Sequence, residues 1–95
     1  MAIRCFRDRE LEEFFWSGKR IKNCPWHQLA QVAKRKLDML HFAKELYDLK
    51  SPPSNHLETL KGNLKGYYSI RINDQWRVIF RWDSQPYDVA IVDYH

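Results

Sequence analysis

The fold of this chain is decided by residues 68–82, YSIRINDQWRVIFRW. Apolar and polar side chains alternate on both sides of a polar turn, which is typical of a β-hairpin. A three-residue loop, Asn73–Gln75, places Arg71 opposite Arg77 and gathers the apolar side chains on one face. A two-residue loop would instead pair Arg71 with Val78 and mix the two faces. We therefore predict the longer loop.

The two faces of this hairpin differ in chemistry. The first offers an apolar and aromatic surface for helices to cover, made of Tyr68, Ile70, Ile72, Trp76, Val78, Phe80 and Trp82. A second hairpin around Asp83–Pro86 adds another strand. Its predicted pairs are Trp82 with Tyr87, Phe80 with Val89 and Val78 with Ile91. On the opposite face this register sets Arg81 across from Asp88, a favourable cross-strand pair.

The N-terminal half is helical in its periodicity. Residues 3–6 alternate like a short strand, and Asp8 is placed to cap a helix that Gly18 ends. Pro25 suits the first turn of a second helix, the longest element, which we expect to reach about residue 47. The apolar face of that helix is predicted to be Leu29, Val32, Ala33, Leu37, Leu40, Ala43 and Tyr47.

The order of these elements predicts the fold class. SPPSN at residues 51–55 breaks regular structure, and a short strand follows at residues 57–60. We predict an α+β fold in one domain, residues 1–95, with two N-terminal helices packed on one face of a mainly antiparallel sheet of about four to five strands. Cys5 and Cys24 form no metal-binding pattern, which indicates reduced thiols. No segment approaches the ~20 apolar residues of a membrane span, so we expect a soluble, cytoplasmic protein without a membrane partner.

The charge of the chain favours a polyanionic partner. Sixteen Lys and Arg against twelve Asp and Glu give a net charge of +4. Nucleic acid and an acidic protein satisfy this charge equally well. The basic runs at residues 19–22 and 34–36 are candidate docking surfaces for either one.

The second face of the sheet sets two arginines directly opposite each other. Like charges in such a pair destabilise a sheet, so something must compensate Arg71 and Arg77. A carboxylate, Asp93 or Asp74, is one answer. A phosphate, which guanidinium groups bind as planar forks, is the other.

The C-terminus ends in Asp93-Tyr94-His95 directly after an apolar strand. Imidazole is the side chain that titrates nearest neutral pH, so His95 is either a solvated tail residue or an acid/base group. Lys61 and Lys65, at the entry to the sheet, are phosphate contacts or an inert turn. The other histidines show no ligand spacing to one another, and we predict neither a metal nor a cofactor.

Four motifs occur together in this chain: PPSN at 52–55, LETLKG at 57–62, YSIRINDQWR at 68–77 and IVDYH at 91–95. In combination and order they resemble the HigB-type branch of the RelE/ParE toxin superfamily. The resemblance covers the whole chain and is most specific in its C-terminal half. It implies a RelE-like fold and the toxin of a bacterial type II toxin–antitoxin system, which cleaves messenger RNA on the translating ribosome and inhibits growth.

The resemblance also implies partners and site residues. The partners are the ribosome and mRNA, a HigA-like antitoxin with a helix-turn-helix fold, and operator DNA through the antitoxin complex only. The residues it carries over for RNA cleavage are Lys61, Arg77, Asp93, Tyr94 and His95, with Arg71 as a neighbour. Relatives in the superfamily poison DNA gyrase, which keeps a gyrase inhibitor open as an alternative, although the terminal His argues against it. A non-catalytic RNA- or protein-binding module is the other alternative.

The reaction implied by this resemblance needs no metal. The 2′-hydroxyl attacks the adjacent phosphate, giving a cyclic phosphate and a free 5′-hydroxyl, so the site must supply a base, an acid and cations. His95 is the candidate acid or base, with Asp93 as a base or an orienting group. Arg77, with Arg71 or Lys61, would hold the phosphate. Tyr94 would stack on a base or position the 2′-hydroxyl.

Overall fold

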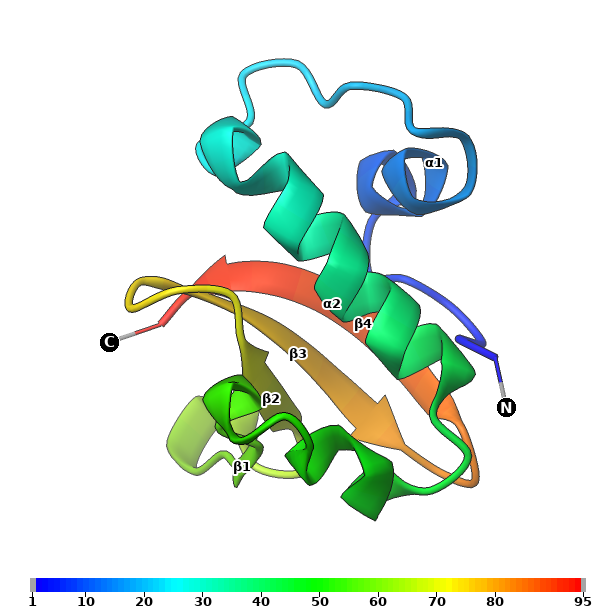
Figure 1. Ribbon diagram of the computed structural model, residues 1–95, viewed down its shortest axis with the longest axis vertical. Coiled ribbons are helices and arrows are strands. Elements are labelled where there is room, and N and C mark those ends of the chain that lie inside the picture. The colour runs from blue at the N-terminus through cyan, green and yellow to red at the C-terminus, as the bar shows by residue number, and fades with distance from the viewer. Residues whose placement is uncertain (1, 95) are drawn as a thin grey trace.

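Four strands form one antiparallel sheet in chain order, β1-β2-β3-β4 (Figure 1). The computed structural model describes residues 2–94. The strands are β1 (Glu58–Thr59), β2 (Tyr68–Arg71), β3 (Trp76–Trp82) and β4 (Pro86–Asp93). Two α-helices, α1 (Arg9–Ser17) and α2 (Ala30–Phe42), precede them and contribute to the core on one face of the sheet. The predicted α+β architecture is confirmed.

The β2–β3 hairpin has the predicted register. Arg71 lies opposite Arg77, and the backbone N–H of Ile72 donates to the carbonyl of Trp76 at 2.9 Å, closing a loop of three residues. Inside the loop, the Asn73 side chain accepts from the backbone N–H of Trp76 at 2.7 Å. This local bond explains why the loop takes the longer form, because it satisfies a backbone donor at the turn.

The register of the β3–β4 hairpin was predicted only in part. Val78 does lie opposite Ile91, but the pairing shifts between Ile79 and Arg81. The prediction that Arg81 faces Asp88 is wrong, because Arg81 pairs with Tyr87. Trp82 likewise pairs with Pro86 and not with Tyr87. The cause is a β-bulge around Asp88, whose φ is 53°, and one extra residue in a strand displaces every pair beyond it.

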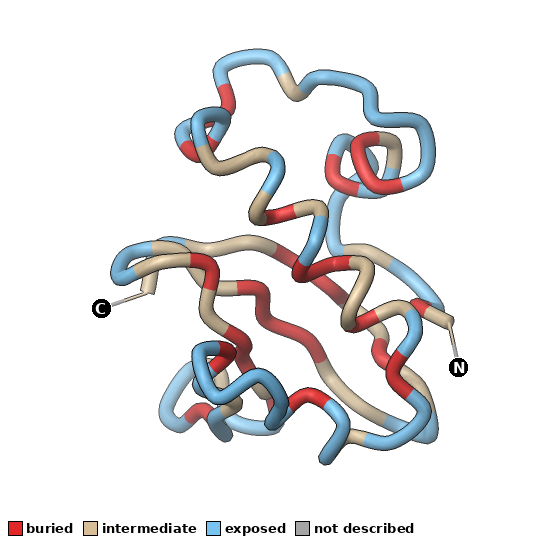
Figure 2. The backbone as a smooth tube through the Cα atoms, viewed as in Figure 1, coloured by how far each residue is buried: buried red, intermediate tan, exposed pale blue. Residues whose placement is uncertain are grey.

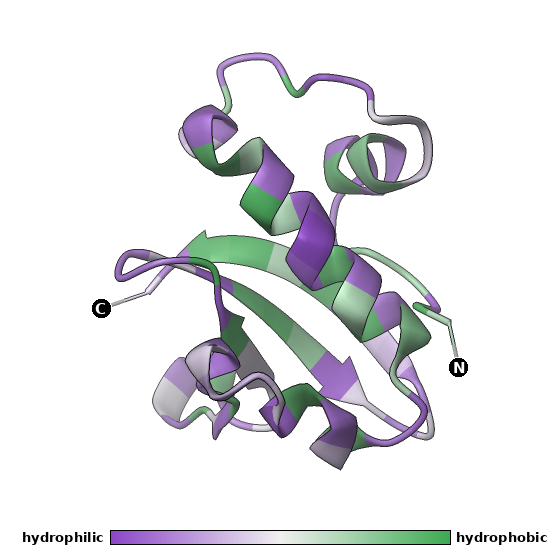
Figure 3. Ribbon diagram, viewed as in Figure 1, coloured by the Kyte–Doolittle hydropathy of each residue, from purple (hydrophilic) through white to green (hydrophobic). Residues whose placement is uncertain are grey.

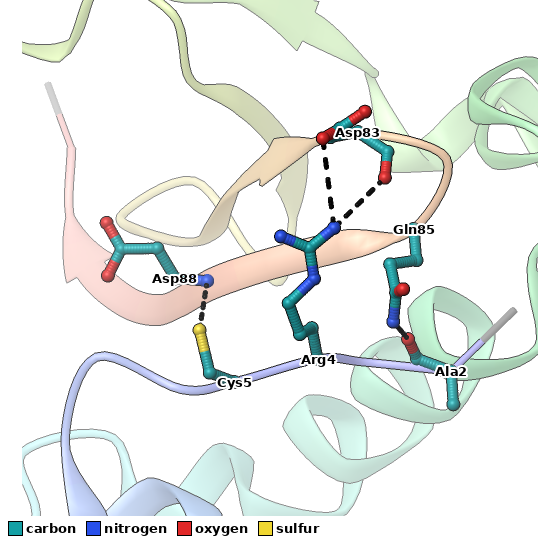
Figure 4. A network of polar contacts seen from close by, with 6 residues as sticks. All are labelled: Ala2, Arg4, Cys5, Asp83, Gln85 and Asp88. Atoms are coloured by element: carbon teal, nitrogen blue, oxygen red, sulfur yellow. Dashed lines mark hydrogen bonds and ion pairs between the residues drawn. The ribbon is translucent and has the colours of Figure 1, made fainter.

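The N-terminal segment lies along the outer edge of β4 and anchors this bulge. Its backbone bonds run from Arg4 N to Pro86 O at 2.8 Å and from Arg7 N to Val89 O at 2.7 Å. The Sγ atom of Cys5 accepts from the displaced N–H of Asp88 at 3.3 Å (Figure 4). Of residues 3–6, only Phe6 makes a β-bridge, a parallel one to Val89, so the segment is extended without forming a regular strand. It covers part of an edge that would otherwise be open. Cys5 and Cys24 are free thiols.

Helix α1 follows the sequence signals closely. The Asp8 side chain accepts from the backbone N–H of Leu11 at 2.9 Å, and Gly18 ends the helix in the left-handed conformation. Helix α2 is shorter than predicted at both ends. A 3-10 turn, His27–Leu29, precedes it, and the chain becomes extended at Ala43.

The reason for this early end lies in the next few residues. The Asp48 side chain accepts from the backbone N–H groups of Lys44 at 2.8 Å and Glu45 at 3.0 Å. These bonds begin a separate 3-10 helix, Leu46–Lys50, with its own capping box. The predicted place of Tyr47 on the apolar face of the long helix is wrong, since its side chain is 71% exposed.

The core lies between the helices and the predicted apolar face of the sheet (Figure 2, Figure 3). Its fully buried side chains include Leu37 and Leu40 from α2, Val78 and Phe80 from β3. The second face carries a smaller cluster of its own. The buried members of that cluster are Leu60, Tyr67, Ile79 and Ala90. Tyr67 is therefore not available as a stacking surface.

A buried polar centre joins α2 to the segment before the sheet. Asn55 is fully buried and accepts from the Nζ atom of Lys36 at 2.5 Å, while its amide donates to the carbonyl of Leu49 at 3.1 Å. Burial lowers the pKa of Lys36, and the charges of Arg35 and Arg71 lower it further. Lys36 is thus part of the interior and cannot belong to a docking surface. The proposed basic run at 34–36 is reduced further, because Lys34 pairs with Asp38 at 2.7 Å.

We predict that Asn55→Ala lowers the free energy of unfolding by about 3 kcal/mol, because it removes the partner of the Lys36 ammonium and of the carbonyls of Leu49 and Ser51. Asn63→Ala, at an exposed turn position, is the matched control and changes it by less than about 0.5 kcal/mol. Urea titration followed by circular dichroism measures both. Equal small effects would show that the buried amide is replaceable by water.

Candidate functional site

Arg77 is the centre of a polar cluster on the second face of the sheet. Its side chain is only 15% exposed and lies in an ion pair with Glu58 at 3.2 Å. The same Nη1 atom donates to the hydroxyl of Ser69 at 3.3 Å and to the carbonyl of His56 at 3.4 Å. These contacts come from three elements, so the guanidinium is held in one position. A fixed, partly buried cation is suited to an anion that approaches from solvent.

Tyr94 lies beside this cation at the end of β4. The guanidinium carbon of Arg77 is 5.7 Å from the centre of the Tyr94 ring. The backbone N–H of Tyr94 donates to the carbonyl of Gln75 at 2.9 Å, which continues the sheet past the end of the strand. The C-terminal segment is therefore fastened to the β2–β3 loop, as Figure 1 shows.

A shallow hollow of about 510 Å³ lies next to Tyr94, between it and β1. Lys61 lines this hollow together with Glu58, so the structure brings Lys61, Tyr94 and the ion pair of Arg77 to one place. The hollow is open, as expected for a site that binds a segment of a polymer and not a small molecule. Lys65 is exposed after the next turn and does not line the hollow.

Arg71 and Asp93 flank the cluster from the loop side. Arg71 forms an ion pair with Asp74, one of the two carboxylates predicted to compensate the facing arginines. Asp93 accepts from the side-chain amide of Gln75 at 2.9 Å and faces Trp76 in the register. Both side chains are thus held at the β2–β3 loop. His95 lies outside the described residues, and its predicted role stays a prediction.

Sequence reasoning missed two residues of the cluster. Glu58 compensates Arg77, whereas we had considered only Asp93 and Asp74 for this role. His56 lies at the edge of the cluster around Arg77, because its carbonyl accepts from this guanidinium. Its backbone has a positive φ of 47°. The sequence did contain one signal, since both residues fall in or between the PPSN and LETLKG motifs.

Arg81 has a different environment from Arg77. Its guanidinium lies 4.5 Å from the centre of the Tyr67 ring, and Arg7 covers the same ring at 5.3 Å. The Tyr67 hydroxyl donates to Asp88, and the Tyr67 phenol raises the pKa of Arg81. This cluster lies toward the other end of β3. It packs the second face and is separate from the hollow beside Tyr94.

The cluster around Arg77 offers a fixed cation, a second cation, a ring and carboxylates along one open surface. That combination suits a phosphodiester whose base can stack and whose phosphate needs charge stabilisation. The family of HigB-like toxins, described as the RelE-like toxin of the type II toxin–antitoxin system HigB, matches residues 4–95.

The chain belongs to this family. It is 44% identical over 82 residues to Toxin HigB-1 of Vibrio cholerae serotype O1, covering 86% of this chain and 84% of that toxin. It also resembles the solved YoeB-YefM complex from Staphylococcus aureus, with a TM-score of 0.56 and 24% identity over 100% of this chain and 97% of that one. A YoeB/ParE toxin from Agrobacterium tumefaciens matches over the full length of both chains with a TM-score of 0.51 and 17% identity. These structural likenesses support the RelE-like fold of this HigB-like toxin.

Among residues 2–94, no helix has the length and apolar character needed to span a bilayer. The motifs that suggested the family now have places in the fold: LETLKG forms β1 and the rim of the hollow, and YSIRINDQWR forms the β2–β3 hairpin with both arginines.

Proposed function

We propose that this toxin is a ribosome-dependent endoribonuclease that cleaves mRNA during translation by attack of the 2′-hydroxyl on its own phosphate. The single observation that carries this proposal is the position of Arg77, fixed by Ser69, His56 and Glu58 beside the Tyr94 ring. A guanidinium held in this way can stabilise the extra negative charge of a phosphorane without reorganising. The ring beside it gives a base a surface on which to stack.

The other groups fit the remaining demands of the reaction. Lys61, which lines the hollow, and Arg71, which lies opposite Arg77 in the register, would be further phosphate contacts. Lys65 would be an outer contact for the RNA that flanks the cleaved bond. His95 and Asp93, at the end of the chain, supply acid and base. Because general acid and base catalysis adds only about 10²–10⁴ in rate, such an open site depends on the ribosome to hold the RNA in position.

His56 extends this proposal. Its carbonyl contacts Arg77, and its imidazole belongs to a residue exposed at the rim of the same cluster. An imidazole can donate or accept a proton, so we include His56 as a second candidate for proton transfer. The acid and the base would then be drawn from His56, Asp93 and His95.

The partners follow from the family. We propose a separate antitoxin with a helix-turn-helix fold, through which the complex binds operator DNA, and a cytoplasmic site of action on ribosomes. Primer-extension mapping of cellular mRNAs after brief induction tests the function. Discrete cleavage sites within translated regions support it. DNA damage without mRNA loss would indicate that the toxin inhibits gyrase. If neither DNA damage nor mRNA cleavage occurs, the protein is a non-catalytic binding module.

Deletion of His95 is expected to abolish growth inhibition while the toxin still folds and binds its antitoxin. The His95 imidazole is one of the groups proposed for proton transfer. Ribosome-dependent cleavage by the purified variant is the measurement. Cleavage at the wild-type rate would remove His95 from the mechanism.

His56→Asn is expected to lower cleavage by about 10²-fold, within the range for one acid/base group. Asparagine is chosen because it tolerates the positive φ of this position, so the backbone contact to Arg77 is retained. His27→Asn, exposed in the turn before α2, is the control and keeps full activity. The same loss in both variants would indicate a general effect on the fold.

Arg77→Ala is expected to lower cleavage by about 10²–10³-fold, the usual effect of removing one donor that stabilises transition-state charge. Arg81→Ala lowers it by less than about tenfold, since Arg81 packs on Tyr67 away from the hollow. Single-turnover assays on stalled ribosomes compare the two, with thermal melting to correct for stability. Equal losses would mean that the RNA path extends over Arg81.

A further inference from the structure

A second surface of the toxin has the features of a protein-docking site. A cleft of about 230 Å³ opens between the end of α1, the loop at residues 19–26 and the start of α2. Its floor is apolar and includes Phe14, Ile21, Cys24 and Trp26. A wider hollow of about 550 Å³ adjoins it and shares Ile21 and Cys24.

The floor of the cleft is rigid. Phe14 and Trp26 pack edge to face with ring centres 5.3 Å apart, and they are 9% and 7% exposed. Ile21 is half-buried and lines both hollows, so it is the accessible part of the apolar wall. Rigid apolar pockets of this kind are where single side chains of a partner contribute most to binding.

The rim of the cleft is positively charged. Arg20 lines both hollows and Lys22 lines the wider one, and no carboxylate lines either hollow among the described residues. Neither cation makes an ion pair within residues 2–94, whereas the neighbouring Lys19 pairs with Glu13 at 3.6 Å. Unpaired cations around an apolar floor are complementary to an acidic partner with an apolar anchor.

We propose that this cleft is the docking site for an acidic segment of the antitoxin, which inserts one apolar side chain against Ile21, Phe14 and Trp26. Arg20 and Lys22 pair with carboxylates of the same segment. This inference rests on the proposed antitoxin partner. It does not depend on RNA cleavage, because the cleft lies in the helical layer and shares no residue with the cluster around Arg77.

The observations favour a protein over RNA on this surface. RNA bases bind by stacking on exposed ring faces. The rings of Phe14 and Trp26 are nearly covered and packed against each other, so they offer edges to a side chain and no open face to a base. RNA phosphates would bind Arg20 and Lys22 but would leave the apolar floor of the cleft without a partner.

The test is the affinity of purified toxin for the antitoxin encoded in the same operon, measured by titration calorimetry. Ile21→Asp places a charge on the apolar wall and weakens binding by at least about 30-fold. The double variant Arg20→Glu, Lys22→Glu weakens it by about tenfold or more and reduces its dependence on salt. Lys50→Glu, an exposed cation at the end of the 3-10 helix Leu46–Lys50 and outside the cleft, is the control and stays within about threefold of wild type.

Ribosome association and cleavage by the free variants separate the possible failures. If the cleft variants bind the antitoxin with wild-type affinity, the docking proposal is overturned. If in addition they lose ribosome association, the surface binds RNA. If the toxin cleaves no mRNA but the affinities change as expected, the proposed function fails and the docking site stands.

A measurement on the unaltered toxin covers the case in which Ile21→Asp does not fold. Hydrogen–deuterium exchange of wild-type toxin is compared with and without the antitoxin. We expect slower exchange at residues 18–27 in the complex. Unchanged exchange in that segment overturns the proposal without reference to any variant.

Discussion

Two guanidinium groups face each other across β2 and β3, and the site is organised by the way each is compensated. Arg71 and Arg77 are opposite in the register, where like charges repel. Each arginine has its own carboxylate from a different side of the sheet: Asp74 in the loop for Arg71 and Glu58 in β1 for Arg77. The two ion pairs resolve the repulsion, and the one formed by Arg77 ties this cation to the hollow, because Glu58 lines it.

This arrangement explains why so short a strand as β1 is present. With only Glu58 and Thr59, β1 adds little to the sheet, yet it carries the carboxylate that fixes Arg77 and leads to Leu60 and Lys61. Leu60 is buried in the small cluster that covers the second face, so the position of Lys61 is tied to that packing. The residues that line the hollow are thus held in place by the ion pair of Glu58 with Arg77 and by the burial of Leu60.

The sequence was sufficient for the parts of the fold set by local chemistry. The three-residue loop followed from alternation in residues 68–82, and the ends of α1 followed from Asp8 and Gly18. The errors arose where contacts from outside the patterned segment decide its structure. The bulge at Asp88 depends on the N-terminal segment beside β4, which no pattern within β4 reveals. The early end of α2 depends on Asp48, whose capping competes with continued helix.

The candidate site shows the same division. The sequence located Arg71, Arg77 and Tyr94, because their places follow from strand register and chain order. It missed Glu58 and His56, because their contacts with Arg77 span about twenty residues of chain and depend on how the segment after α2 folds back. That return is directed by Asn55, which bonds to Lys36 of α2 from the turn just before His56.

The position of Asn55 connects the interior to the chemistry of the site. Its amide is buried and satisfied by groups of α2 and of the 3-10 helix Leu46–Lys50, so the turn that it ends has little freedom. His56 follows immediately, in a left-handed conformation that turns its carbonyl toward Arg77. A buried hydrogen bond in the helical layer therefore sets the direction in which a group on the opposite face of the sheet is presented. The precision of an open, shallow site of this kind comes from the packed residues behind it.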